Sequence, residues 1–417
     1  MTTRRARRGA VGRWRWLGTL LGPAALAGAL LGGGLPAAAG AQQMFQARAE
    51  METRLFPHAP LTPGQSGRAS ASFAIEPEVQ FGWGDHLLRV TAFARADTED
   101  GARTHLDVRE ALWEWFAGDW EVRAGVGRVF WGVTESQHLV DIVNQTDLVE
   151  AVDGEEKLGQ PLIGVTRLSA FGTFDFFLLP IFRERTFPGA DGRLRTALPV
   201  LEERANVERQ LDFAARWFHV LGPIDLGVSH FHGTAREPRF ALVDGAEAPA
   251  LAPVYETIDQ TAVDAQATLG DWLFKLEALT RSGQGPRAWA AVGGFEYTFA
   301  DLRGSGADLG VLAEYHFDSR PDAVVGQLAL TPTPFDDDLF IGGRLALNDV
   351  QSSELLGGAV VDLSTGATAT FVEASRRLGE DWLAELEART FSWTHSSDPL
   401  HSVRRDDHLQ LRLSWYY

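Results

Sequence analysis

The sequence predicts an all-β fold, a transmembrane antiparallel β-barrel of about 18 strands, and three observations support this prediction. Apolar and polar residues alternate with a period of two along most of the chain. The alternating segments are about 9–13 residues long, which suits tilted membrane-crossing strands better than the shorter strands of soluble sheets. Short turns and long polar connections also alternate, as in barrels with short periplasmic turns and long extracellular loops.

The composition of the 417 residues excludes several other classes of protein. A hydrophobic content of 45% is too high for a disordered chain. The absence of cysteine excludes a disulfide framework, a Cys-ligated zinc site and a thiol nucleophile. A net charge of −18 argues against a nucleic-acid partner. We therefore expect no nucleic acid, no metal and no cofactor.

Residues 1–41 are expected to form a cleaved signal peptide. The segment begins with several arginines and has no acidic residue, and an apolar stretch runs from about Leu17 to Leu35. Small residues then extend from Ala38 to Ala41, which is typical of a cleavage site. We expect residues 42–417 to form a single barrel domain after cleavage. An uncleaved N-terminal anchor helix is the alternative.

The clearest predicted strand lies at the C-terminus, where apolar Leu409, Leu411 and Leu413 alternate with polar residues. An even number of strands would place both chain termini on the periplasmic side. Sixteen strands is the alternative, because 161–180 and 353–378 alternate poorly. The 18 predicted strands are 44–56, 70–83, 86–97, 105–116, 119–130, 161–169, 172–180, 209–219, 222–234, 260–269, 271–282, 287–299, 307–317, 337–348, 353–363, 367–378, 381–393 and 406–417.

Aromatic residues recur directly after the short turns. Trp120, Trp272 and Trp382 each begin a predicted strand, and Trp415 and Tyr417 fall at the same predicted end of the barrel. Amphipathic rings favour the headgroup level of a membrane. This pattern predicts an aromatic girdle on the periplasmic side.

A barrel of this size is too wide for side chains to fill, so we expect an aqueous lumen. Loop 131–160 is acidic but also carries apolar residues, which indicates that it packs inside the barrel, and loop 181–208 is rich in arginine. Together they predict a charged constriction. Alternatively, both loops lie on the cell surface, with divalent cations binding the carboxylates between lipopolysaccharides. The candidate pore-lining and constriction residues are Arg89, Arg128, Arg183, Arg185, Arg216, Glu135, Asp141, Asp147, Glu314, Arg344 and Arg389.

Two segments carry a family resemblance. The terminal strand Leu409 to Tyr417 resembles the signal that the barrel-assembly machinery recognises in bacterial outer-membrane proteins. A second segment looks like a strand-to-loop pattern of an uncharacterised proteobacterial porin-like family, and it contains Gly127, Arg128, Trp131, Gly132, Glu135, Asn144 and Asp147. The resemblance implies a passive channel in the bacterial outer membrane. Its implied partners are outer-membrane lipids, lipopolysaccharide, the assembly machinery and a small solute.

The sequence thus favours an outer-membrane porin or facilitated-diffusion channel that is not an enzyme. An adhesion or assembly barrel with a plugged lumen is the first alternative. A barrel enzyme is the less favoured one, and its candidates are His230 and His232, two residues apart on one strand face. We expect that pair to lie on the lumen-facing wall.

Overall fold

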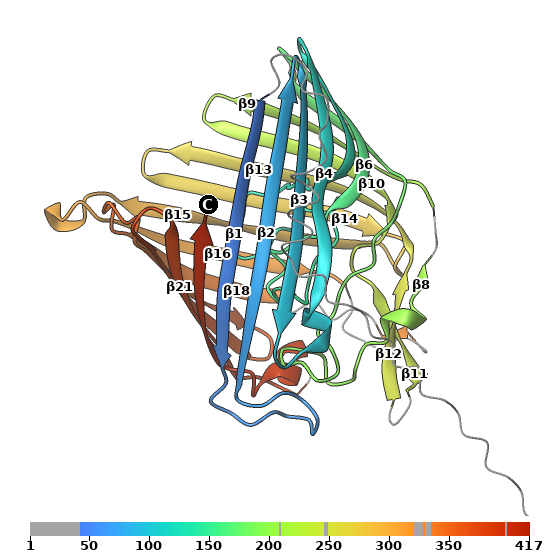
Figure 1. Cartoon of the computed structure of the whole chain (residues 1–417), viewed down its shortest axis with the longest axis vertical. Coiled ribbons are helices and arrows are strands. Elements are labelled where there is room, and N and C mark those ends of the chain that lie inside the picture. Colours follow the sequence, from blue (N-terminus) through green and yellow to red (C-terminus); the bar gives the residue numbers. More distant parts are fainter. Residues whose placement is uncertain (1–41, 208–209, 246–248, 321–327, 330–334, 397) are drawn as a thin grey trace, which may run out of the picture. The chain divides into compact units, whose positions relative to one another are not determined.

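The computed structural model describes residues 42–417 except 208–209, 246–248, 321–327, 330–334 and 397, so the predicted signal peptide lies outside the described residues. Figure 1 shows the long strands standing side by side. The strands of the main sheet are β1 (Gln42–Leu55), β2 (Ala69–Trp83), β3 (His86–Asp97), β4 (His105–Ala117), β5 (Trp120–Gly127), β6 (Gln160–Ser169), β7 (Gly172–Leu179), β9 (Asp212–Leu221), β10 (Ile224–Thr234), β13 (Thr257–Leu269), β14 (Trp272–Ser282), β15 (Ala288–Phe299), β16 (Asp308–Asp318), β18 (Asp337–Ala346), β19 (Glu354–Asp362), β20 (Thr368–Leu378), β21 (Trp382–Trp393) and β22 (His408–Tyr416).

These 18 strands form one antiparallel sheet that closes on itself. The last strand, β22, pairs with β1 in a register that places Leu409 opposite Leu55 and Tyr416 opposite Arg48. Closure leaves no strand edge unpaired, as a barrel in lipid requires. The predicted number of 18 is therefore confirmed over 16, and the poorly alternating segments are β6, β7, β19 and β20.

The outer face of the barrel is apolar. On β14, Trp272, Phe274 and Leu276 are 41–45% exposed. Glu277, the residue after Leu276, points to the opposite face and is fully buried. The same alternation recurs on β16, where Tyr315 and its apolar neighbours face outward. Large apolar side chains that remain exposed on a closed sheet form the belt that meets lipid.

The connections at the two ends of the barrel differ in length. Beside the chain termini, most are two-residue turns, and Gly118 and Gly270 in them have φ values of +61° and +64°, a region that favours glycine. Trp120 and Trp272 follow such turns, and Trp382 follows the three-residue turn 379–381. These three side chains are 41–49% exposed, in keeping with the girdle. The opposite end carries the long connections, although 283–287 and 363–367 there are short.

Part of the predicted loop region is ordered as a second sheet. The strands β8 (Asn206–Val207), β11 (Arg239–Asp244), β12 (Pro249–Tyr255) and β17 (Leu328–Ala329) form it. It draws on connections that the sequence predicted only as polar stretches, because its short strands show too few alternating residues. The described residues also include four short 3₁₀ helices, η1 (Gly101–Arg103), η2 (Glu202–Arg204), η3 (Leu302–Gly304) and η4 (Pro399–Val403). Within the described ranges, no helix is long and apolar enough to cross a membrane.

Candidate functional site: the inward loop and its cavities

The segment between β5 and β6, residues 128–159, packs against the inner face of the barrel; we call it the inward loop. Trp131, Val140, Ile142 and Val143 in it are at most 4% exposed. They share one apolar cluster with side chains of the barrel wall, including Leu112, Leu162, Phe177, Phe231 and Leu279. The predicted strand 119–130 consequently ends early, at Gly127, where the chain turns inward.

Glu277 on β14 anchors the loop to the wall. Its side chain is fully buried and accepts hydrogen bonds from the backbone N–H groups of Val133 (2.7 Å), Thr134 (3.1 Å) and Val140 (3.0 Å). The Thr134 hydroxyl donates a further bond of 2.8 Å. One carboxylate thus satisfies four donors of a loop segment that forms no ladder of its own.

Glu314 on β16 makes a second anchor. It accepts the backbone N–H groups of Glu135 (2.8 Å) and Ser136 (2.9 Å) and the Ser136 hydroxyl (2.5 Å). The Ser136 Oγ also lies 2.7 Å from His316 Nε2. The Glu135 side chain points to the wall cations, with Lys275 Nζ at 3.3 Å and an ion pair to Arg344. Ser136 thus helps to attach the inward loop to β16.

The return arm of the loop is held on the opposite side. The Asn144 amide donates to the carbonyls of Gly127 (3.0 Å) and Leu158 (2.8 Å) and accepts the Val129 N–H (2.8 Å). The fully buried Asp147 pairs with Arg109 of β4 at 2.7 Å. The Asn144 contacts hold the two ends of the inward loop together, and the Asp147 pair fixes its return arm to β4.

The tip of the loop, residues 152–156, is held mainly by ion pairs. Asp153 Oδ2 lies 2.8 Å from Arg389 Nη2 on β21, and Glu155 lies 3.4 Å from His138 Nε2. Arg389 is also bound by Glu373 at 3.1 Å and by Glu387. One guanidinium is therefore shared by three carboxylates, which leaves this point of the wall negatively charged.

His138 carries a proton at neutral pH. Burial alone would lower its pKa, but the nearby carboxylates of Glu155 (3.4 Å) and Glu277 (3.9 Å) raise the pKa to about 10. Burial alone would raise the pKa of Glu155, but the contact with His138 holds that pKa below its ordinary value. The tip is thus tied by charged pairs at both of its sides.

The arginine-rich loop does not face the acidic loop through ion pairs. Arg183 pairs with Asp107 of β4 at 2.7 Å, and Arg193 pairs with Asp406, before β22, at 2.7 Å. Arg185 donates to Gln145 Oε1 at 3.3 Å. Among the described residues, no arginine of 181–208 lies within 4.0 Å of a carboxylate in 131–160. Wall arginines pair with several inward-loop carboxylates instead, such as Arg109 with Asp147 and Arg95 with Glu150. Asp141 pairs with Lys157 of the loop itself.

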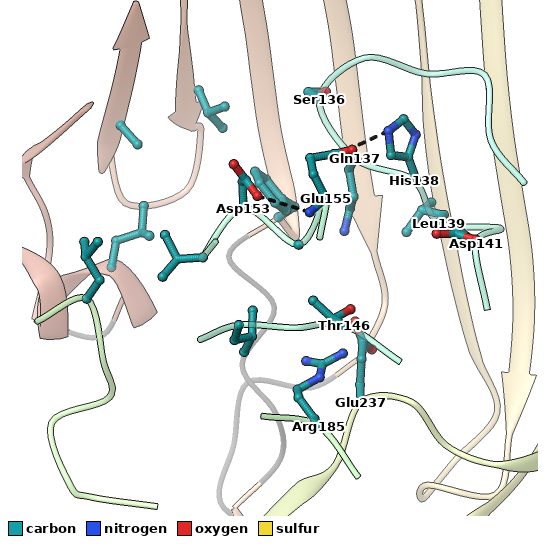
Figure 2. Close-up of a pocket in the computed structure, with 18 of the residues that line it drawn as sticks. Ser136, Gln137, His138, Leu139, Asp141, Thr146, Asp153, Glu155, Arg185 and Glu237 are labelled. Atoms are coloured by element: carbon teal, nitrogen blue, oxygen red, sulfur yellow. Dashed lines mark hydrogen bonds and ion pairs between the residues drawn. The ribbon is translucent and has the colours of Figure 1, made fainter. Parts of the chain in front are cut away.

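Two cavities of several hundred Å³ lie beside the inward loop in the described part of the chain. The first has a volume of about 870 Å³ and a mostly apolar wall, with charged residues at both ends (Figure 2). The second has about 450 Å³ and a charged wall that includes Arg54, Glu385, Glu387 and Arg412. Asp153, Glu155, Glu373 and Arg389 line both cavities, so the loop tip and the wall opposite it separate the two spaces.

The structure divides the sequence-predicted site residues into two groups. Glu135, Asp141, Arg185, Arg344 and Arg389 line the cavities. The others lie in wall or loop contacts instead. Arg89 and Arg128 approach Glu110 (3.4 and 3.7 Å), Arg216 pairs with Asp264 (2.6 Å), and Arg183, Asp147 and Glu314 make the contacts given above.

Sequence reasoning missed several cavity residues. Glu373 lies on a strand with weak alternation, and Glu237 and Arg320 lie in connections without any period. The expectation for the histidine pair was wrong: His230 and His232 share the outward face of β10 with the exposed Val228, while Phe231 points into the inner cluster. Alternation fixes which residues share a face, and the assignment of that face was inverted here.

Comparison with known proteins identifies the fold and no family. No family model matches the chain, and no curated protein matches it. Among solved structures, Acinetobacter baumannii OccAB3 is similar with a TM-score of 0.53 at 10% identity, covering 91% of this chain and all (100%) of that one. A BenF-like porin from Pseudomonas fluorescens Pf-5 follows with a TM-score of 0.51 at 11% identity, with 91% and 98% covered. Wzi of Escherichia coli, described as a carbohydrate-binding β-barrel involved in capsule assembly, has a TM-score of 0.50 at 11% identity, with 89% and 84% covered. The chain thus has the fold of outer-membrane porins and related barrels.

Proposed function

We propose that the protein is an outer-membrane diffusion channel whose solute path runs between the tip of the inward loop and the wall formed by β18–β22. The observation that carries this proposal is the pair of cavities that meet at Asp153, Glu155, Glu373 and Arg389. Figure 2 shows Asp153 and Glu155 on the cavity wall. Charged side chains at the narrowest part of a pore select among solutes.

The path is displaced to one side of the lumen. The apolar cluster of the inward loop packs against β4, β6, β7, β9, β10 and β13–β15. On the other side, Arg344, Leu356, Glu373 and Arg389 line open volume. A solute that enters the first cavity would meet the second only by passing the loop tip.

Purified protein in a planar lipid bilayer is expected to give stepwise ion conductance. Gel mobility with and without boiling confirms that the barrel is folded, because intact membrane barrels resist detergent and migrate differently when unheated. Folded protein without conductance would overturn the proposal.

A closed binding barrel is the second candidate, and the extensive packing of the inward loop favours it. It predicts folded protein that binds a ligand at the long-loop end without conductance. The bilayer recording separates the two candidates directly.

A further inference from the structure

We infer that the first cavity binds a solute with a negative group and a positive group at opposite ends of an apolar body. This inference rests on the proposed function for its role in transport, but the binding site is defined by the cavity alone. Three features support it: a cationic end, an acidic end and an apolar wall between them.

The cationic end lies at the side of the long loops. Glu237 accepts from Arg281 Nη1 (2.9 Å) and Arg320 Nη1 (2.5 Å), and Arg320 also binds Asp318 at 2.6 Å. Arg185 lines the same end. Three guanidinium groups against two carboxylates leave a positive charge there.

Arg185 is the cation with unmet charge. Within the described part of the chain it has no carboxylate within 4.0 Å, and its one side-chain hydrogen bond is from Nε to Gln145. Partial burial lowers its pKa, and the side chain keeps intermediate exposure. Arg320 and Arg281, with a smaller contribution from Arg185, hold the pKa of Glu237 well below its ordinary value despite burial, so that carboxylate is already fully engaged.

The acidic end lies at the loop tip. Asp153 and Glu373 line this end of the first cavity, and they share Arg389 with Glu387, which lines only the second cavity. Figure 2 shows Asp153 and Glu155 well separated from Arg185 and Glu237, with Thr146 between the two groups. A solute with only a negative charge would be attracted to the cationic end and repelled by the acidic end. A solute with only a positive charge would be attracted to the acidic end and repelled by the cationic end.

The wall between the ends is mostly apolar. Ile142, Leu148, Phe187, Phe240 and Leu279 contribute to it. Such a wall favours a hydrocarbon body, and its two polar ends would fix the orientation of the solute. A zwitterion with an apolar spacer satisfies all three regions at once.

The test uses three probes of equal chain length: 6-aminohexanoate (zwitterion), hexanoate (anion) and hexylammonium (cation). Their binding to folded protein in detergent micelles is measured by ligand-observed NMR titration. We expect 6-aminohexanoate to bind about tenfold more tightly than either single-charge probe, because it gains a second charge-assisted contact.

Two variants assign the ends. Arg185→Gln should weaken 6-aminohexanoate and hexanoate about tenfold and leave hexylammonium unchanged. Glu373→Gln should weaken 6-aminohexanoate and hexylammonium instead. The matched control is Arg204→Gln, an exposed arginine of the same loop that does not line the cavity. Mobility on gels with and without boiling confirms that each variant is folded.

The outcomes separate the inference from the proposed function. Equal binding of the three probes, or no response to either variant, in protein that conducts ions would overturn the zwitterion site and leave the channel intact. Zwitterion binding in protein that never conducts would support the site and overturn the channel.

Discussion

The base and the tip of the inward loop are held by different chemistry. At the base, buried Glu277 and Glu314 accept backbone N–H groups, so the loop backbone itself is tied to the wall. At the tip, Asp153 and Arg389 join as a pair of side chains that are 27% and 17% exposed. Buried, charge-assisted bonds to backbone are strong, whereas partly exposed ion pairs contribute little. We therefore expect the part of the loop bound by Glu277 and Glu314 to be held firmly, and the tip to be held more weakly.

The largest effect is expected from Glu277→Ala. It removes four hydrogen bonds and leaves buried N–H groups without a partner, which should cost about 3 kcal/mol of the free energy of unfolding. Denaturant unfolding followed by tryptophan fluorescence measures this cost. Glu380→Ala, in an exposed turn, is the matched control and should change the stability little. A small effect at Glu277 would remove the distinction between base and tip.

Ser136→Ala is expected to have a smaller effect, about 1 kcal/mol, in the same unfolding experiment. The hydroxyl bonds to Glu314 and His316 are lost, but both backbone bonds to Glu314 stay. Ser136 also lines the first cavity, so conductance is recorded in parallel. A large loss of conductance with unchanged stability would mean that Ser136 acts in the path and not in the anchor.

The tip should loosen as the pH rises. Because the pKa of His138 in the folded chain is about 10 against an ordinary value of 6.5, its proton stabilises the fold fully below pH 6.5. That contribution declines as the pH rises from 6.5 towards 10. Limited proteolysis at the tip should therefore be faster at pH 10 than at pH 6.5, and His138→Gln should reduce the difference. His401→Gln, in another loop, is the control, and an identical reduction there would contradict the assignment.

The smallest effect on stability is expected from Asp153→Asn, about 0.5 kcal/mol or less. Its effect on conductance should nevertheless be clear, because it removes one of the carboxylates at the meeting point of the cavities. Single-channel recording should show reduced preference for cations over anions. An unchanged ion preference would place the path elsewhere.

Much of the fold was predictable because strand alternation is local. Most of the 18 barrel strands follow from periods within single segments, whereas 161–180 and 353–378 alternate poorly. The apolar residues of 131–160 already indicated inward packing. The partners of that loop were not predictable, because Thr134 and Glu277 are separated by 143 positions and only the barrel register brings them together. The same reason explains why Arg89 and Arg216, correctly placed on the wall, turned out to lie away from the cavities.

The central claim is that solutes pass between the loop tip and Glu373. The chain has no cysteine, so a single introduced thiol can be labelled without background. Single-channel conductance of Glu373→Cys is compared before and after reaction with a bulky thiol reagent, with Arg123→Cys, on the wall outside both cavities, as the matched site. We expect a sharp loss of conductance at position 373 and little change at position 123. Loss at 123 with none at 373 would contradict it.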